Sequence, residues 1–156
     1  MKPPVELDTV NRKILTILQA EGRLTYAEVG RRVGLSPAAV TERVAKLEDE
    51  GLLTGYRAEI NIQRLGYSVQ AYIKVFNEPP TFKSFESHAR TLRHVLECHR
   101  VTGDASHLLR VVCEGVPELE VLLDDLMSYG RTETLLLMSS AVPNRQLDLF
   151  TGSDAN

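Results

Sequence analysis

The sequence predicts an α+β protein in which a winged-type helix-turn-helix domain of three helices precedes a ferredoxin-like βαββαβ domain. Three observations support this fold class. Apolar residues recur at helical spacing up to Gly51, and strand-like runs alternating with two amphipathic stretches follow from Ser68. Capping residues and glycines mark the ends of the expected elements. The expected division is 1–60 for the first domain, 61–67 for a linker, 68–145 for the second domain and 146–156 for a polar tail.

The first two helices have clear start signals. A helix over residues 7–20 takes Asp8 as its N-cap, and Gly22 follows its end. Thr25 and Glu28 form a capping box at the start of the second helix, in which each side chain can accept a hydrogen bond from the other's backbone amide.

A tight turn separates the second helix from the third. Gly34 ends the second helix, Ser36 caps the third, and Pro37 occupies the first helical position, where its missing N–H costs nothing. Gly51 ends the third helix. Two short helices joined in this way after another helix form the helix-turn-helix arrangement, and their narrow apolar stripes require one shared core. A generic three-helix bundle without a DNA function is the alternative.

The second half changes to a strand-helix pattern. After a short strand over 52–60, the expected strands and helices are 68–76, a helix from 82 to 92, 95–101, 107–114, a helix over 117–129, and 132–142. This β-α-β-β-α-β order places both helices on one face of an antiparallel sheet. The strands are apolar at successive positions, which indicates burial on both faces. We therefore expect the free face to pack against an identical chain in a homodimer.

Composition excludes several classes of protein. The chain has 156 residues, 43% of them hydrophobic, and no apolar run near the ~20 residues that span a bilayer. Its start lacks the apolar stretch of a signal peptide. Cys98 and Cys113 are too far apart for a zinc site, and the four histidines show no metal spacing and are expected at the surface or a sheet edge. We expect a cytoplasmic protein without a metal or cofactor.

Charge is unevenly distributed along the chain. The net charge is −3, but residues 23–46 hold five basic residues against two acidic ones. From residue 61 onward, nine basic residues stand against twelve acidic ones. Because DNA binding depends on where the positive charge lies, the basic segment favours a nucleic-acid interface in the helix-turn-helix domain.

The assembled motifs resemble those of the Lrp/AsnC family, also called feast/famine regulators. The resemblance covers roughly residues 7–145 and depends on a set of short motifs in a fixed order. These are Leu7-Asp8, Ile14-Leu15, Gly22-Arg23, Val33-Gly34-Leu35-Ser36, Arg43-Val44, Leu47-Glu48, Gly51, Gly55-Tyr56 and Leu65-Gly66. The resemblance implies a sequence-specific DNA-binding transcriptional regulator that responds to an amino acid or a related metabolite and assembles from dimers into larger oligomers.

The DNA contacts are expected on the third helix and at helix N-termini. Outward positions of the third helix are free to meet the major groove, and Arg43 is the best candidate for a bidentate contact with guanine or for a phosphate contact. An intramolecularly paired arginine is the alternative. The predicted DNA-binding set is Arg23, Thr25, Tyr26, Ser36, Pro37, Ala38, Ala39, Thr41, Glu42, Arg43 and Lys46.

The effector contacts are expected in the second domain. Asp104 can face an ammonium group, Gly103 permits a close backbone approach, and Thr132 and Thr134 can offer hydroxyls to a carboxylate. An ordinary Gly-Asp turn and ordinary strand threonines are the alternative. The predicted effector-binding set is Gly103, Asp104, Ser106, His107, Thr132 and Thr134. The family commonly has an acid and an aromatic where this chain has Ser106 and His107, so the effector's identity stays open.

Two other functions compete with a specific regulator. Some haem-biosynthesis decarboxylases resemble this family, and His99, Arg100 or His107 would then act on a tetrapyrrole. The well-formed helix-turn-helix, and the lack of a Ser-His-Asp pattern, a Gly-rich phosphate loop or an HExxH motif, argue against an enzyme. The other alternative is an architectural protein that binds DNA with little sequence preference.

Overall fold

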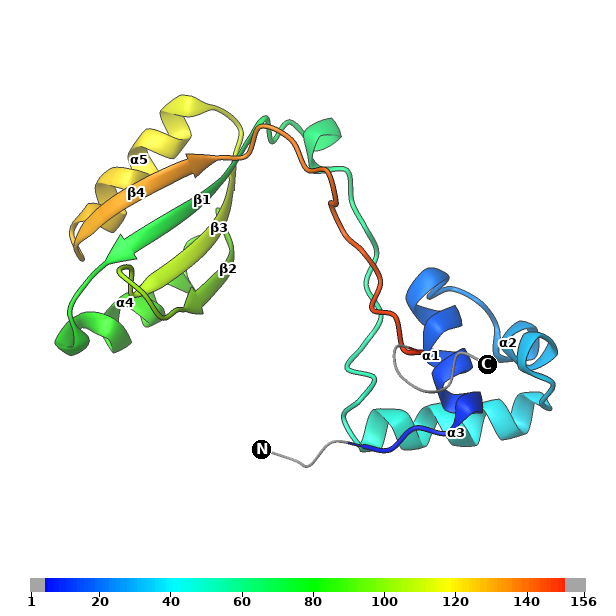
Figure 1. Cartoon of the computed structure of the whole chain (residues 1–156). Coiled ribbons are helices and arrows are strands. Elements are labelled where there is room, and N and C mark those ends of the chain that lie inside the picture. The colour runs from blue at the N-terminus through cyan, green and yellow to red at the C-terminus, as the bar shows by residue number, and fades with distance from the viewer. Residues whose placement is uncertain (1–4, 151–156) are drawn as a thin grey trace. The chain divides into compact units, whose positions relative to one another are not determined.

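A computed structural model of the chain describes residues 5–150 and divides into two compact units (Figure 1). The helix unit joins the N-terminal residues up to Glu59 to the C-terminal residues from Val142. The sheet unit comprises Ile60–Ala141. The inclusion of residues from Val142 in the helix unit was not predicted, because the expected division gave 142–145 to the second domain and 146–156 to a polar tail. The last six residues, expected to fray, lie outside the described residues.

Three short helices form the helix unit, as predicted. They are α1 (Thr9–Ala20), α2 (Tyr26–Val33) and α3 (Pro37–Asp49). Each contributes to one buried cluster, made of Ile14, Leu15, Leu18, Val29, Val40, Val44 and Leu47. The capping box of α2 is present in full, and Gly34 takes a left-handed conformation at its end.

The strand expected over 52–60 is wrong. In the described part of the helix unit, this segment is irregular and mostly exposed. A strand needs a partner to receive its backbone hydrogen bonds, and the described residues of this unit supply none.

The sheet unit confirms the ferredoxin-like prediction. Its elements are β1 (Val69–Phe76), α4 (Phe82–Ala89), β2 (Val95–Arg100), β3 (His107–Cys113), α5 (Val116–Met127) and β4 (Arg131–Leu136). Short 3-10 turns lie at Ile62–Leu65 and Pro79–Thr81. The strand order is β2-β3-β1-β4, and every neighbouring pair is antiparallel. The last strand ends at Leu136, earlier than expected, because the pairing with β1 stops there and the chain leaves the sheet.

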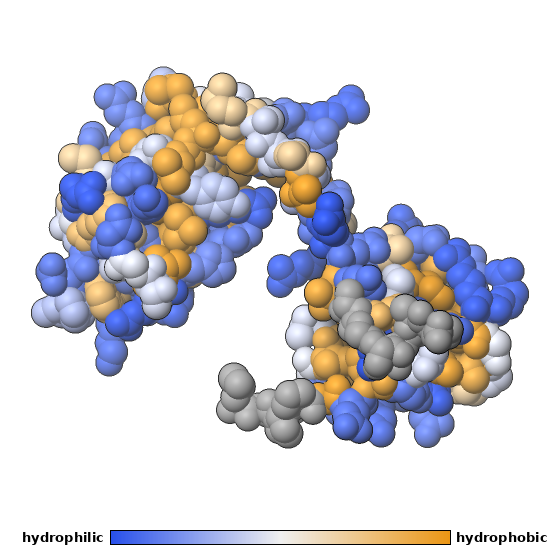
Figure 2. All heavy atoms as spheres, viewed as in Figure 1, coloured by the Kyte–Doolittle hydropathy of each residue, from blue (hydrophilic) through white to orange (hydrophobic). Residues whose placement is uncertain are grey.

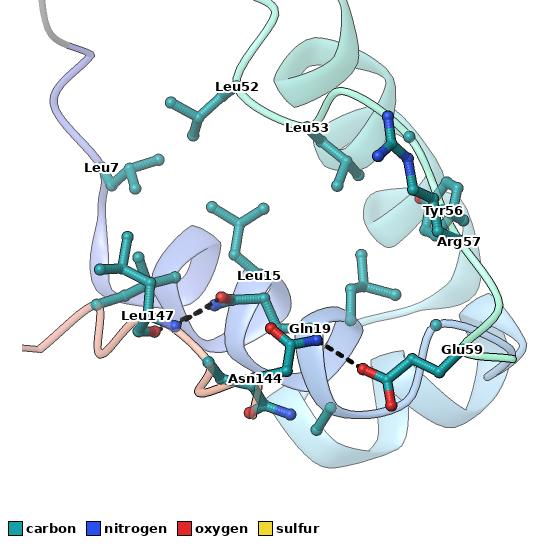
Figure 3. A pocket seen from close by; sticks show the side chains of 16 residues that line it. Leu7, Leu15, Gln19, Leu52, Leu53, Tyr56, Arg57, Glu59, Asn144 and Leu147 are labelled. Atoms are coloured by element: carbon teal, nitrogen blue, oxygen red, sulfur yellow. Dashed lines mark hydrogen bonds between the residues drawn. The ribbon is translucent and has the colours of Figure 1, made fainter. Parts of the chain in front are cut away.

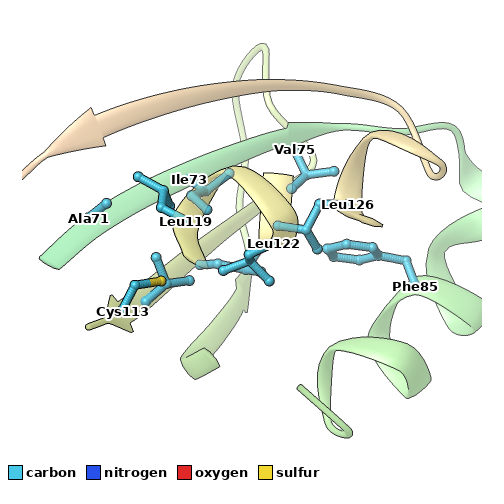
Figure 4. Close-up of a cluster of buried hydrophobic side chains, with 10 residues drawn as sticks. Ala71, Ile73, Val75, Phe85, Cys113, Leu119, Leu122 and Leu126 are labelled. Atoms are coloured by element: carbon cyan, nitrogen blue, oxygen red, sulfur yellow. The ribbon is translucent and has the colours of Figure 1, made fainter. Parts of the chain in front are cut away.

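Both helices cover the same face of the sheet. Figure 4 shows β1 residues Ala71, Ile73 and Val75 directed at α5, whose Leu119, Leu122 and Leu126 complete the cluster with Phe85 of α4. Paired residues of antiparallel strands share a face, so His107 and Thr132, the two partners of Val75, also lie on the helix side.

The opposite face of the sheet is partly apolar and is not covered by α4 or α5, the described helices of the sheet unit. Tyr72 and Leu135 face each other there and are 36% and 45% exposed. Figure 2, drawn in the orientation of Figure 1, shows hydrophobic residues on the surface of the sheet unit. The ion pairs Lys74–Glu133 and Arg110–Glu97 lie on this face as well. Among the described helices, all are too short or too polar to cross a lipid bilayer.

Candidate nucleic-acid interface and effector region

The turn between α2 and α3 is fixed by a close backbone approach. The Leu35 amide donates to the Gly30 carbonyl at 2.9 Å. A Cβ on Gly30 would lie 2.5 Å from the Leu35 carbonyl oxygen, so this buried position accepts no side chain. Ser36 then caps α3 by accepting from the Ala39 amide at 3.2 Å. The orientation of α3 on α2 is therefore set by glycine and by a cap.

Helix α3 presents one exposed face. Its buried stripe, Val40, Val44 and Leu47, packs into the core. Most of the predicted DNA-binding residues on and before α3 are exposed, namely Ser36, Pro37, Ala38, Thr41, Glu42 and Lys46. Ala39 and Arg43 are half-buried. Thr41 donates to the Pro37 carbonyl at 2.9 Å, which turns its hydroxyl toward the helix backbone.

Arg43 is engaged inside the protein. Its Nη1 donates to Asp8 Oδ2 at 2.7 Å and to Asn11 Oδ1 at 2.9 Å. Asp8 is also the N-cap of α1 and accepts from the Asn11 amide at 2.6 Å. The Asn11 amide, and then the Arg43 guanidinium, lower the pKa of Asp8 below its ordinary value. An intramolecular partner for Arg43 was the alternative expected from the sequence, but no local spacing identifies Asp8 as that partner, because the two residues are far apart along the chain.

The predicted DNA-binding residues near the start of α2 differ in their exposure and in their contacts. The Thr25 hydroxyl donates to Glu28 Oε2 at 2.7 Å within the capping box. Tyr26 is half-buried against the core, and Arg23 is exposed in the loop before α2. Arg31, which was not among the predicted contacts, adds an exposed cation in the last turn of α2.

The C-terminal segment lies along α1. The Gln19 side chain bonds the backbone of Leu147 in both directions, at 3.1 and 3.3 Å. Arg12 Nη1 donates to the Leu149 carbonyl at 2.8 Å, and Asn144 donates to Glu59 at 2.7 Å. A cavity of about 750 Å³ lies between this segment, α1 and residues 52–59 (Figure 3). The segment is thus held by hydrogen bonds at a few points above a loosely filled space.

In the sheet unit, the β2–β3 turn is bound to the end of β1. Gly103 has a φ of +115°, and Asp104 accepts from the following amide at 3.0 Å. Ser106 donates through both its amide and its hydroxyl to the Val75 carbonyl, at 3.0 and 2.7 Å. The Asp104 carboxylate is on an exposed residue.

His107 is fully buried, which corrects the expectation that all four histidines lie at the surface or an edge. Its Nδ1 lies 3.0 Å from Asn77 Oδ1, and its Nε2 lies 3.3 Å from Glu86 Oε1. The rings of Phe82 and Phe85 contact it at centroid distances of 5.2 and 4.8 Å. The aromatic and polar contacts of His107 come from α4 and from Asn77, which follows β1, so only tertiary packing brings them together.

The two groups of predicted effector residues lie on opposite sides of β1. Val75 pairs with His107 on one side and with Thr132 on the other. Thr132 and Thr134 are half-buried on the helix side of the edge strand β4. One chain therefore presents the turn and the threonines as two separate groups.

Comparisons with known proteins agree on both units. Residues 7–54 match the winged helix-turn-helix DNA-binding family, and residues 70–147 match the Lrp/AsnC ligand binding domain. An uncharacterized HTH-type transcriptional regulator, YezC of Bacillus subtilis, is 42% identical over 135 residues, which are 86% of this chain and 96% of the relative. The leucine-responsive regulatory protein of Klebsiella pneumoniae is 32% identical over 157 aligned positions, covering 96% of each chain. A feast or famine regulatory protein from M. tuberculosis, solved as a complex with L-methionine, superposes with a TM-score of 0.84 at 30% identity, covering 91% of this chain and 99% of that one.

Proposed function

Since the chain belongs to the Lrp/AsnC family of transcriptional regulators, we propose that α3 enters the major groove of its DNA site. The observation that carries this proposal is the exposed, small-residue start of α3 above a fully buried stripe. Ala38 and Ala39 let the helix N-terminus approach the bases closely, and alanine can contact a thymine methyl.

Other exposed groups suit the phosphate backbone. The helix N-termini at Thr25 and Ser36 direct backbone amides outward, which favours phosphate. Arg23 and Lys46 are exposed cations for the same purpose. Glu42, which is exposed on α3, would accept a hydrogen bond from cytosine.

A homodimer would pair two such helices. The open face of the sheet, with Tyr72 and Leu135 exposed on it, suits packing against an identical face. A dimer would recognise a pseudo-palindromic site with half-sites about one helical turn, or a multiple of it, apart. Association of dimers would then bend or wrap the DNA.

The sheet unit is the effector-binding part of this proposal. It matches a ligand-binding domain, and a relative of similar structure was solved with L-methionine bound. The exposed Asp104 suits an ammonium group, with Gly103 and Ser106 in the same turn, the buried His107 at the start of β3, and Thr132 and Thr134 on the other side of β1. In this role the protein acts in the cytoplasm and catalyses no reaction.

Selection of genomic DNA fragments by the purified chain tests the proposal. The selection is run at near-physiological salt, because non-specific binding falls steeply with salt, and with or without a pool of amino acids. A few enriched fragments that share an inverted repeat are expected. Lys46→Ala should weaken binding to all fragments and lower the salt dependence, whereas Lys13→Ala, an exposed change on α1, should do neither. Uniform recovery of all fragments would refute a specific regulator.

A further inference from the structure

A hollow of about 450 Å³ lies between α4 and the edge strand β2. Helix α4 is only eight residues long, and most of β2 is exposed beside it. The volume falls within the roughly 300–1,000 Å³ of small-ligand clefts. Two acidic and two basic residues are among its lining, which consists of Glu86, Ala89, Arg90, Val95, Leu96, Glu97, Cys98, Arg100 and His107.

Opposite charges meet across this hollow. Glu86 and Arg90 lie one helical turn apart on the α4 side. Arg100 comes from β2, and its guanidinium is held over the ring of Phe82 at 4.4 Å. Arg100 pairs in register with His107, so a cation and the Glu86 carboxylate both lie beside the buried imidazole.

His107 connects the hollow to the β2–β3 turn. Its Nε2 faces Glu86 in the lining, while its Nδ1 contacts Asn77, which is also bonded to Ser106 of the turn. The buried Asn77 side chain thereby links the imidazole to the turn.

We propose that the α4–β2 hollow is a binding site for a small zwitterion, a free amino acid. Its carboxylate lies between Arg90 and Arg100, and its ammonium group faces Glu86. Charge-assisted hydrogen bonds of this kind are stronger than neutral ones. The site is distinct from the exposed Asp104 carboxylate, and His107 carries its occupancy to the turn. This inference rests on the proposed effector function for the class of ligand.

Calorimetric titration of the full-length protein tests the site. The probes are the standard amino acids, and then, for one that binds, its N-acetyl derivative and its carboxamide. Arg100→Gln should weaken binding about tenfold or more, because a charged partner of the carboxylate is lost. It should also reduce the preference for the free acid over the carboxamide. Glu86→Gln should reduce the preference for the free amine over the N-acetyl derivative.

Matched variants separate this effect from loss of structure. Lys83→Gln changes an exposed charge on α4 outside the lining and should bind like the wild type. Arg100→Lys retains the charge and should recover part of the affinity. Wild-type binding by both Arg100→Gln and Glu86→Gln would overturn the inference. If Asp104→Asn alone abolished binding, the inference would fail while the proposed effector function stood. If no amino acid bound the wild type, both would fail.

Discussion

Arg43 is the residue whose role the structure makes most testable. If it ties α3 to the start of α1, as its contacts with Asp8 and Asn11 indicate, then Arg43→Ala and Asp8→Ala should both destabilise the helix unit. Asp8→Ala removes the N-cap as well, at a cost of about 0.5–2 kcal/mol. The two side chains are 34% and 51% exposed, and such an ion pair contributes only about 0.2–1 kcal/mol. We therefore expect about 1 kcal/mol for Arg43→Ala and about 1–3 kcal/mol for Asp8→Ala.

Urea unfolding followed by circular dichroism measures these losses, and hydrogen exchange of the α1 amides assigns them to the helix unit. The double variant should show a coupling free energy of about 0.2–1 kcal/mol, because each single change already breaks the shared pair. DNA affinity, measured by fluorescence anisotropy where both variants are folded, should change little. A base contact predicts the opposite pattern, a loss of about 1–3 kcal/mol of specific binding in Arg43→Ala and none in Asp8→Ala. A loss of DNA affinity in Arg43→Ala alone, together with no coupling free energy in unfolding, would refute a structural role for the Arg43–Asp8 contact.

Acid titration tests how the Asn11 amide and the Arg43 guanidinium together stabilise the Asp8 carboxylate. The pKa of Asp8 in the folded chain is lowered from its ordinary value of 3.8. A carboxyl with a lowered folded pKa adds stability above its unfolded pKa and loses it as the pH falls through the folded value. The stability difference between wild type and Asp8→Asn should therefore be constant above about pH 5 and shrink below about pH 4. A difference that stayed constant down to pH 2 would contradict the stabilisation of the Asp8 carboxylate by these two donors.

Three further changes test the packing of each unit. Gly30→Ala should lower the free energy of unfolding by about 1–3 kcal/mol, because the new methyl would lie 2.5 Å from the Leu35 carbonyl oxygen. The control in the same urea titration is Gly22→Ala, whose new methyl would lie 3.6 Å from its nearest neighbour. Deleting residues from Asn144 onward should cost about 1–3 kcal/mol and reduce hydrogen-exchange protection of α1, since the Leu149 contact and the Gln19 bonds are lost; unchanged protection would show that the segment does not dock. Leu135→Glu should shift the sedimentation coefficient toward that of the monomer. The control, Val121→Glu on the exposed side of α5, should leave it unchanged. Equal sedimentation of the two variants would refute dimerisation through the sheet face.

The local signals of the sequence were sufficient for the order and type of the helices. The capping box at Thr25, the cap at Ser36 followed by Pro37, and the left-handed Gly34 all act over four residues or fewer, so their spacing alone defines the hydrogen bonds they make. The switch to strand-like runs also predicted the ferredoxin-like order correctly, because β1, β3 and both helices bury one side against the same core.

The failures arose where a hydrogen bond needs a distant partner. The segment 52–60 has a strand-like composition but lacks a neighbouring strand in the described part of its unit, and β4 ends where its pairing with β1 ends. The C-terminal segment looked like a free tail because its backbone partners, Gln19 and Arg12, belong to the first helix.

The sequence by itself determined the three helices of the helix unit and the order of strands and helices in the sheet unit, since their capping residues and apolar periodicity depend on neighbours a few positions away. Tertiary structure alone decided that Arg43 meets Asp8, that His107 is buried between β1 and α4, and that a charged hollow opens beside β2. These contacts join residues far apart in the chain, so they depend on how the packed elements meet rather than on any spacing that can be read from the sequence.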